Sequence, residues 1–419
     1  MPNLNFNLGR RSGADIVGLD IQPGHVAAVQ ARVNGAIVVR HAAGASLPAD
    51  TVREGEVLDE GVLAETLREM FKDGGLSRRV RLGVANQRTV LRTLELPPVT
   101  DRKELDAAVR FLADDQVPMP LSNAVLDYHS LGIHDTPAGP RQQVVLVAAQ
   151  RDMIERLLAA VRDAGLRPEG IDLSAFALIR SLYRSGPEHA GRVLYLNVDG
   201  LTNMAIAEGT TCRFTRVVGG GIEAMAVELA ERRAIPLLEA RALLAAFDLT
   251  APSAPTPPAA LDPPTVDATP APTSELEHPP VEPAASGGDA PEGEQDHDAR
   301  ERAMSYSEMA SVAPTAVLTP QTASAADVRT VLENGIREIA GEVRNSLDFH
   351  RSQENGGEVA RVVLSGAALE LPGFADALQA QLGVEIERES VRVDEREPGG
   401  VSAHRLAIAA GLAVEEAPR

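Results

Sequence analysis

The sequence contains no tryptophan, and aromatic residues make up only 3% of its 419 positions. The apolar fraction is nevertheless 44%, so a hydrophobic core must be built mainly from alanine, valine, leucine and isoleucine. A single cysteine, Cys212, excludes an internal disulfide. The sequence has no run of about 18 apolar residues and no apolar N-terminal signal segment. These absences predict a soluble, cytoplasmic protein that does not insert directly into a membrane.

Lysine is almost missing, because all but two of the 40 basic residues are arginine; the exceptions are Lys72 and Lys103. Acidic residues number 60, which gives a formal net charge of −20. Such an excess of negative charge opposes binding to phosphate backbones and to anionic lipid surfaces. The composition therefore predicts no nucleic-acid partner.

The largest change in composition falls at residues 250–300, where 12 of 51 residues are proline, ten are acidic and only Arg300 is basic. A segment of this kind buries too little apolar surface to offset the entropy lost on ordering. We predict a disordered acidic, proline-rich insertion over about 250–324. It would serve either as a simple spacer or as a docking tether.

Before the insertion, strand and helix patterns alternate. Strands are expected at 16–19, 26–29 and 36–39, joined by turns at Pro23-Gly24 and Asn34-Gly35, and a helix follows over 62–70. Residues 90–149 form an insert with its own strands and helix. A second strand-rich half begins at 192–198, a helix of about 25 residues covers 328–347, and another helix closes the chain at 406–414. This order predicts a mixed α/β fold of two similar halves.

Two of the predicted strand-turn-strand units end in polar residues, one at Asp20 and the other at Asn197. A glycine in such a turn lets backbone N–H groups approach a phosphate, and a carboxylate at the strand end holds hydrated Mg²⁺. Short turns rich in Asp and Gly also occur for conformational reasons alone. From spacing, the two interpretations remain open.

Eight short stretches along the chain carry a pattern that is specific when taken together. They include Val-Gly-Leu-Asp-Ile at 17–21 and Leu-Glu-Leu-Pro-Pro at 94–98. The others lie at 109–128, 164–168, 171–172, 343–349, 362–366 and 371–373. In this order they resemble the PilM family of actin-like type IV pilus assembly proteins, and the resemblance covers about residues 13–249 and 325–414.

The resemblance implies an actin-like two-lobed fold, with two RNase-H-like lobes and a small α+β subdomain inserted in the first lobe. The corresponding domains are a flexible arm at 1–12, a first lobe at 13–187 with its insert at about 85–150, and a second lobe at 188–419. It also implies ATP with Mg²⁺ between the lobes, and a groove beside the insert for the cytoplasmic N-terminal peptide of a PilN-like inner-membrane protein. The protein would then be peripheral at the inner face of the cytoplasmic membrane through that partner.

The phosphate turns depart from the family pattern. Gln22 and Pro23 stand where the family has Gly-Ser, and the family's lysine position falls at Ala27. The second turn is one residue shorter and begins with Asn197 instead of aspartate, unless Asp199 takes over that role. We therefore expect a weakened nucleotide site. Its candidate residues are Asp20 (also for Mg²⁺), Gly24, His25, Asn197, Asp199, Gly200, Thr202, Gly220, Ser365 and Gly366.

For the peptide groove, placement of the insert suggests Leu94, Leu96, Phe111, Leu112 and Val147, although core packing explains the same apolar residues. The N-terminal arm alternates Asn with apolar residues at 4–8 and loosely resembles the partner peptide. The arm would then occupy a groove of its own chain or of a neighbour, and self-association would follow in the second case. Deleting residues 1–11 is then expected to raise affinity for a partner peptide.

Other chemistry has little support in the sequence. The histidines are scattered without metal-ligand spacing, and Cys212 lies in an apolar run that predicts a small buried residue instead of a nucleophile. The alternative to a scaffold is an active ATPase or a sugar-kinase-like phosphotransferase, for which Asp172 and Asp199 are the candidate bases. A membrane-tethered cell-division actin homologue would need an amphipathic C-terminal anchor, whereas the chain ends Glu-Glu-Ala-Pro-Arg at 415–419, which is acidic and has no apolar face.

Overall fold

The computed structural model describes residues 16–72, 75–137, 139–251, 324–353, 356–394 and 400–417. The expected N-terminal arm and almost all of the expected acidic insertion lie outside these ranges. Within them, no helix has the length and apolar character needed to cross a membrane.

The first lobe is built on a six-stranded sheet in the order β10-β6-β1-β2-β3-β16. Its strands are β1 (Val17–Gln22), β2 (His25–Val33), β3 (Ile37–Ser46), β6 (Arg79–Val84), β10 (Arg167–Leu173) and β16 (Arg392–Val393). The hairpin of β4 (Val52–Arg53) and β5 (Glu56–Val57) lies beside it. Helices α1 (Glu60–Met70) and α3 (Arg151–Asp163) cover one face through an aliphatic core. The tight β1–β2 turn uses Gly24 at φ +83°, a conformation that favours glycine.

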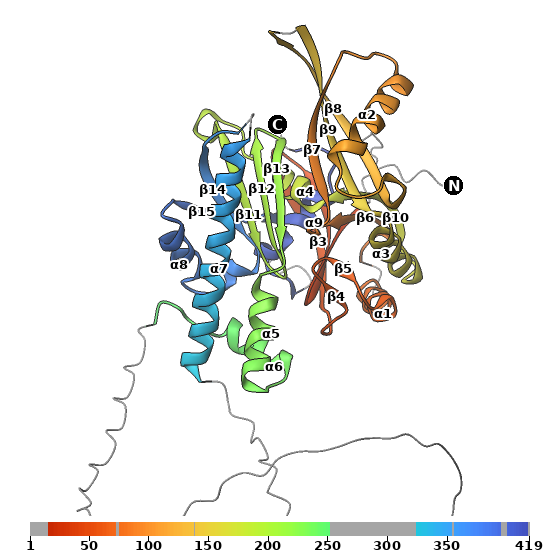
Figure 1. Ribbon diagram of the computed structural model, residues 1–419. Helices are drawn as coiled ribbons and strands as arrows, with labels where there is room; N and C mark the ends of the chain where they lie inside the picture. The colour runs from red at the N-terminus through yellow and green to blue at the C-terminus, as the bar shows by residue number, and fades with distance from the viewer. Residues whose placement is uncertain are drawn as a thin grey trace, which may run out of the picture. The chain divides into compact units, whose positions relative to one another are not determined.

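The insert consists of β7 (Val90–Leu96), α2 (Arg102–Gln116), β8 (Ala124–Thr136) and β9 (Gly139–Gln150). The three strands form an antiparallel sheet in the order β7-β9-β8, and α2 packs on it through Leu105, Val109 and Ala113. In Figure 1 the insert extends beyond the first sheet on the side of β10. The insert thus has a small core of its own.

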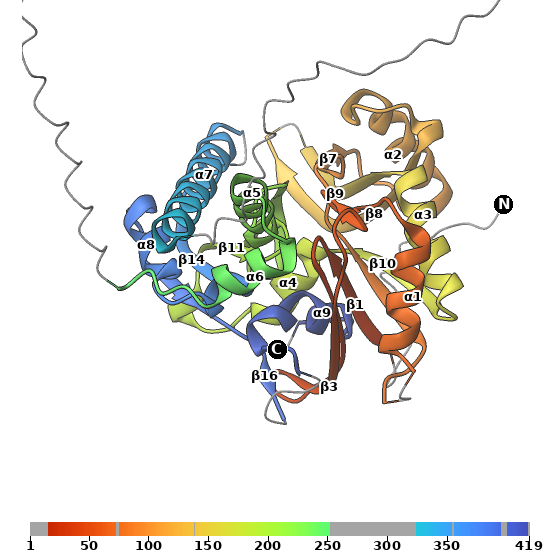
Figure 2. The ribbon, with the colours of Figure 1, turned by 90° about the horizontal axis from the view of Figure 1, so that it is seen from below.

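The second lobe has a five-stranded sheet in the order β13-β12-β11-β14-β15. Its strands are β11 (Arg192–Val198), β12 (Thr202–Glu208), β13 (Thr211–Val218), β14 (Val359–Ser365) and β15 (Ile386–Arg388). Its helices are α5 (Ile222–Arg233), α6 (Leu237–Ala245), α7 (Ala325–Ser352) and α8 (Phe374–Leu382). Helix α7 starts with a capping box of Ser324 and Asp327, and its buried stripe is the apolar face that the sequence predicts. Figure 2 shows α5 and α7 on the same side of this sheet.

The C-terminal segment returns to the first lobe. Strand β16 pairs in parallel with β3, and α9 (Ala407–Leu412) packs on β1 and on α4 (Ser174–Leu182). The sequence analysis placed all of residues 188–419 in the second lobe. The pairing of Arg392 with Val38 joins residues far apart in the chain, and such a contact leaves no local pattern in the sequence. Glycine permits the close approach of α9: a Cβ at Gly18 would lie 1.9 Å from the Ala409 carbonyl oxygen.

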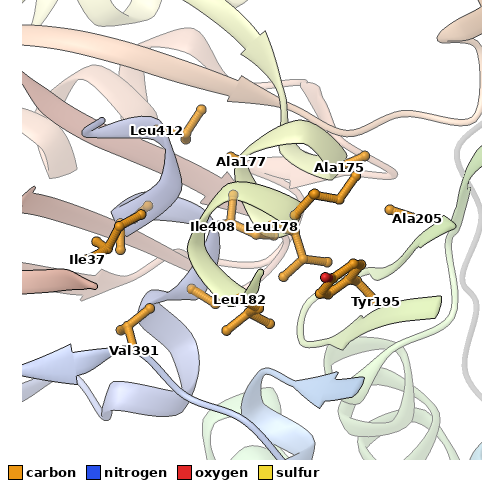
Figure 3. Packing of buried hydrophobic residues seen from close by; sticks show 14 of the residues in the cluster. Ile37, Ala175, Ala177, Leu178, Leu182, Tyr195, Ala205, Val391, Ile408 and Leu412 are labelled. Carbon is orange, nitrogen blue, oxygen red and sulfur yellow. The ribbon is translucent and has the colours of Figure 1, made fainter. Parts of the chain in front are cut away.

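Helices α4 and α9 lie between the two sheets and join the lobes in one core. Figure 3 shows Leu178 and Leu182 of α4 near Ile408 of α9 and near Tyr195 of the second sheet. All four side chains are at most 2% exposed. The two lobes therefore share one continuous hydrophobic core. The β1–β2 turn of the first lobe and the β11–β12 turn of the second lobe also lie against each other.

Candidate functional site

The two turns that the sequence marks as phosphate loops lie against each other. A Cβ at Gly200 would be only 2.3 Å from the Pro23 carbonyl oxygen. The side chain of Gln22 crosses from the first turn to the second, where its Oε1 accepts a hydrogen bond from the Leu201 N–H at 3.2 Å. The first turn is thus bonded directly to the second.

Asp20 lies beneath this bridge and is 2% exposed. Its Oδ2 accepts a hydrogen bond from Gln22 Nε2 at 2.8 Å. Burial raises the pKa of Asp20 to about 7; the hydrogen bond from Gln22 opposes this shift and the charge of Asp199 adds to it. A carboxyl group with this pKa, covered by an amide, is poorly suited to hold a hydrated divalent cation.

Asp199, at the second turn, stands at the centre of a charged network. Its Oδ1 lies 3.4 Å from His25 Nδ1 and 3.4 Å from a terminal nitrogen of Arg405. The same guanidinium donates through Nε to both carboxylate oxygens of Glu370, at 3.1 and 3.2 Å. Burial lowers the pKa of His25, although the nearby Asp199 opposes that shift. The network joins both turns to the C-terminal segment.

A cavity of about 500 Å³ opens beside the network, between the lobes. Four of the predicted site residues, Gly24, His25, Asp199 and Gly200, line it. Arg241 and Glu223 form an ion pair on another wall, and Arg241 Nη2 also donates to the Leu47 carbonyl oxygen at 3.1 Å. Both arginines that line the cavity are therefore already paired with carboxylates.

The other predicted nucleotide residues are brought near the cavity but do not line it. The Ser365 hydroxyl donates to Asn197 Oδ1 at 2.9 Å, and the Thr202 hydroxyl donates to the Gly220 carbonyl oxygen at 2.6 Å. Gly366, at φ +97°, packs so closely that a Cβ would lie 2.4 Å from the Val198 carbonyl oxygen. These residues hold the turns in shape.

A magnesium nucleotide needs free N–H donors and unpaired cationic groups for its phosphates. The Leu201 N–H, a possible phosphate donor, is used by Gln22. The Arg405 guanidinium already neutralises Asp199 and Glu370. The residues in this arrangement do not fit a magnesium nucleotide unless contacts among them are broken. Sequence reasoning missed Arg405, Glu370 and Glu223, since residues so distant in the chain form no local motif.

A second hollow lies between the insert and the first lobe. It is a narrow slot of about 50 Å³ that β8 and β9 border on one side and β10 and α4 on the other. Its apolar wall consists of Val145, Val147, Ile171, Leu173 and Phe176. Charged and polar groups surround that wall, namely Arg81, Asp127, Tyr128, His129, Asp172, Arg180 and Glu415.

Two sheet edges face this slot. Strand β8 is the last strand of the insert's sheet, and β10 is the last strand of the first lobe's sheet, within the described part of the chain. Asp127, on β8, has a buried Oδ2 with no hydrogen-bond partner. Burial raises the pKa of Asp127 to about 6. The slot thus combines open strand edges with an unused acceptor.

The structure separates the five residues suggested for a peptide groove. Leu94 and Leu96 are buried in the insert's own core, and Leu112 packs against that core. Phe111 is 75% exposed on α2 and does not line the slot. Only Val147 lies in its wall. Ile171 and Phe176 were missed, because the apolar pattern of β10 and α4 does not reveal which side chains face the insert.

Asp172 and Cys212, the remaining candidates for chemistry, are an ion-paired and a buried residue respectively. Asp172 lies 2.5 Å from an Arg180 guanidinium nitrogen and lines the slot beside the insert instead of the cavity between the lobes. Cys212 is buried as predicted, and burial raises the pKa of its thiol to about 12. Among the described residues, no group of three or more His, Cys, Asp or Glu side chains is placed to hold a metal ion.

Two lobes that meet at paired hairpin turns define the actin-like α/β class, as the sequence predicts. Residues 18–199 match the family model described as type IV pilus assembly protein PilM, which confirms the resemblance drawn from the sequence motifs. The solved PilM–PilN type IV pilus biogenesis complex is 21% identical, with 95% of this chain and 97% of that chain covered and a TM-score of 0.66. This likeness shows the fold.

Two further solved structures have lower scores. The ethanolamine utilization protein EutJ from Carboxydothermus hydrogenoformans is 14% identical, covers 95% of this chain and 88% of its own, and has a TM-score of 0.47. MreB5 of Spiroplasma citri, solved with AMPPNP bound, is 10% identical, covers 94% of each chain and has a TM-score of 0.43.

Proposed function

We propose that this protein is a PilM-like cytoplasmic component of type IV pilus assembly. It binds the cytoplasmic N-terminal peptide of a PilN-like inner-membrane protein and is thereby held at the inner face of the membrane. The family match over residues 18–199 and the likeness to the PilM–PilN complex support this role.

The observation that carries the proposal is the slot between β8 and β10. An extended peptide gains main-chain hydrogen bonds by pairing with an open strand edge, while its alternate side chains enter pockets. The apolar wall around Ile171 and Phe176 suits one apolar anchor, and the surrounding charges suit polar flanking residues. The slot is narrow, so a single extended segment fits it better than a helix does.

The test is fluorescence anisotropy with a labelled synthetic peptide, taken from the cytoplasmic N-terminus of the PilN-like protein of the same genome. We expect saturable binding at micromolar concentrations. We also expect a marked loss of affinity when alternate backbone nitrogens of the peptide are methylated, because pairing with a strand needs those donors. A scrambled peptide is the control. Equal affinity of the scrambled and native peptides would refute the assignment.

We further propose that the nucleotide site is weakened and that the protein acts as a scaffold. Thermal unfolding with and without 5 mM ATP and Mg²⁺ tests this, since a ligand bound only by the folded state raises the midpoint. We expect a shift below about 1 °C. A shift of several degrees that Asp20→Ala abolishes would restore a nucleotide-binding role.

The alternative function is that of an ATPase or phosphotransferase. It would require a free carboxylate base facing the cavity between the lobes. Asp199 is paired with His25 and Arg405, and Asp172 with Arg180 beside the other hollow. These pairings favour the scaffold.

A further inference from the structure

We propose that the protein closes its own interlobe cleft with an internal clamp formed by Arg405, Glu370, Asp199, His25 and Gln22, so that closure needs no nucleotide. In this clamp, side chains carried by the first lobe bind groups of the second lobe directly. This role is distinct from peptide binding and from a weakened nucleotide site, because these residues would hold the two lobes together in the absence of nucleotide.

Arg405 makes the most extensive of these contacts. It lies in the short helical turn Ala403–Leu406, on the C-terminal segment that joins the first lobe through β16 and α9. Its guanidinium reaches two carboxylates of the second lobe, at 3.4 Å for Asp199 and 3.1 Å for Glu370. A planar guanidinium can hold two acceptors at fixed angles, which a lysine ammonium does not match.

Gln22 and His25 add two more links across the same boundary. Both belong to the first hairpin, and both bind the second turn, through the Leu201 N–H and the Asp199 carboxylate respectively. Gln22 also binds Asp20 within its own lobe, so its amide is held at both ends. The clamp is therefore anchored in the first sheet and in the C-terminal segment at once.

Burial makes these links depend on one another. The Asp199 side chain is 3% exposed, and the side chains of His25 and Arg405 are 11% and 28% exposed. A buried carboxylate that loses its cationic partner keeps its desolvation cost without compensation. Removing Arg405 therefore leaves Asp199 and Glu370 with far less balancing charge, and separation of the lobes hydrates both carboxylates.

Arg241 and Glu223 form a second brace, on helices of the second lobe, that also reaches the first lobe. Arg241 of α6 pairs with Glu223 of α5 and donates to the Leu47 carbonyl oxygen of the first lobe. Gly24 packs directly on Glu223, because a Cβ there would lie 2.4 Å from Oε2. With the clamp and this brace in place, the first turn is held by side chains of the protein itself.

The clamp can be tested by measuring distances between spin labels on the full chain. Labels go on cysteines introduced at two exposed positions, Arg40 on β3 and Ala380 on α8. The native Cys212 is buried and is not expected to react. We expect one narrow distance distribution, unchanged by 5 mM ATP and Mg²⁺. A distribution that narrows only when the nucleotide is added would overturn the proposal.

Variants identify the residues responsible. Arg405→Ala, and separately Gln22→Ala, are expected to broaden the distribution and to speed hydrogen exchange in the two turns at least tenfold. Arg405→Lys should give a distance distribution of intermediate width, narrower than that of Arg405→Ala and broader than that of the wild type. The matched control is Arg351→Ala, which removes an exposed ion pair within α7. A distribution in both Arg405→Ala and Gln22→Ala as narrow as in the wild type would refute the clamp, whether or not the peptide binds.

Discussion

Two hollows of this molecule, the cleft between the lobes and the slot beside the insert, differ in what their polar groups are bound to. In the cleft between the lobes, Asp199, Arg405 and Gln22 bind partners within the protein. In the slot beside the insert, two strands end their sheets, and the buried Oδ2 of Asp127 has no hydrogen-bond partner, although its Oδ1 accepts from the Tyr128 N–H at 2.9 Å. The charged groups of the cleft are therefore mostly paired with one another, although His25 Nε2 is buried there without a partner, whereas the slot keeps an unpartnered acceptor in Asp127 Oδ2.

Gln22 contributes to this difference through its side-chain amide. A glutamine in the first turn brings an amide that can both donate and accept, and it satisfies the buried Asp20 and the Leu201 N–H together. The slot has no equivalent occupant among the described residues. A ligand that enters the cleft meets charged groups that are already paired with one another, whereas a peptide in the slot would meet the unpartnered Asp127 Oδ2.

The largest expected effect comes from blocking the slot. Ile171→Glu places a charge in the apolar wall near Asp172, where it must be buried under a bound peptide. We expect peptide affinity to fall about 100-fold, close to 2.7 kcal/mol, as measured by fluorescence anisotropy.

The matched control for this prediction is Phe111→Ala, which truncates a more exposed apolar residue outside the slot. It should change the affinity less than twofold. Phe176→Ala should lower the peptide affinity about tenfold, and it provides a second test of the slot in case Ile171→Glu does not fold. Circular dichroism checks that both variants are folded. Equal losses for Phe111→Ala and Phe176→Ala would place the peptide elsewhere.

Much of the architecture can be predicted from the sequence. The β1–β2 turn at Pro23-Gly24, the stripe from Val328 to Val343 in α7 and the buried strand β14 all follow from local periodicity and turn chemistry. The family motifs then identify the two turns, and the structure brings them into contact.

The rest depends on contacts between distant residues. Arg405 meets Asp199 across more than 200 residues, and Ile171 faces the slot only because the insert folds over β10. Leu94 and Leu96 illustrate the same limit, since an apolar alternation cannot distinguish a core from a groove. The partners of a side chain, unlike its secondary structure, are set by tertiary packing.

The next effect concerns Asp20, beside the cleft between the lobes. The native pKa of Asp20 is about 7 and its ordinary value is 3.8. The native state therefore binds more protons than the unfolded state between these values, and the contribution of Asp20 to stability falls as pH rises from about 4 to 7. At pH 8 the ionised, buried group costs at most about 4 kcal/mol.

Asp20→Asn should consequently raise the free energy of unfolding at pH 8 by about 2 kcal/mol, with little change near pH 4. Urea denaturation across this pH range provides the measurement. The exposed Asp135→Asn serves as control and should show no such trend. A pH-independent effect of Asp20→Asn would mean that Asp20 is hydrated, and hence that the cleft is open in solution.

The smallest expected effect belongs to the slot. Asp127 has a pKa of about 6 and an unpartnered Oδ2, so it changes charge within the range in which binding can be measured. An ionised carboxylate accepts a hydrogen bond from a peptide N–H more strongly than a protonated one does. Lowering the pH from 7.5 to 5 should weaken peptide binding about fivefold, roughly 1 kcal/mol.

Two variants separate Asp127 from the other charged groups of the slot. Asp127→Asn should bind with little dependence on pH, because its acceptor no longer titrates. His129 also lines the slot, so His129→Gln tests its share of the pH dependence and should keep most of the fivefold change. Arg81, Asp172, Arg180 and Glu415 are present in both variants. A pH dependence that survives in Asp127→Asn and disappears in His129→Gln would assign the pH dependence to His129 and would remove the acceptor role from Asp127, so that the slot would recognise its peptide without that carboxylate.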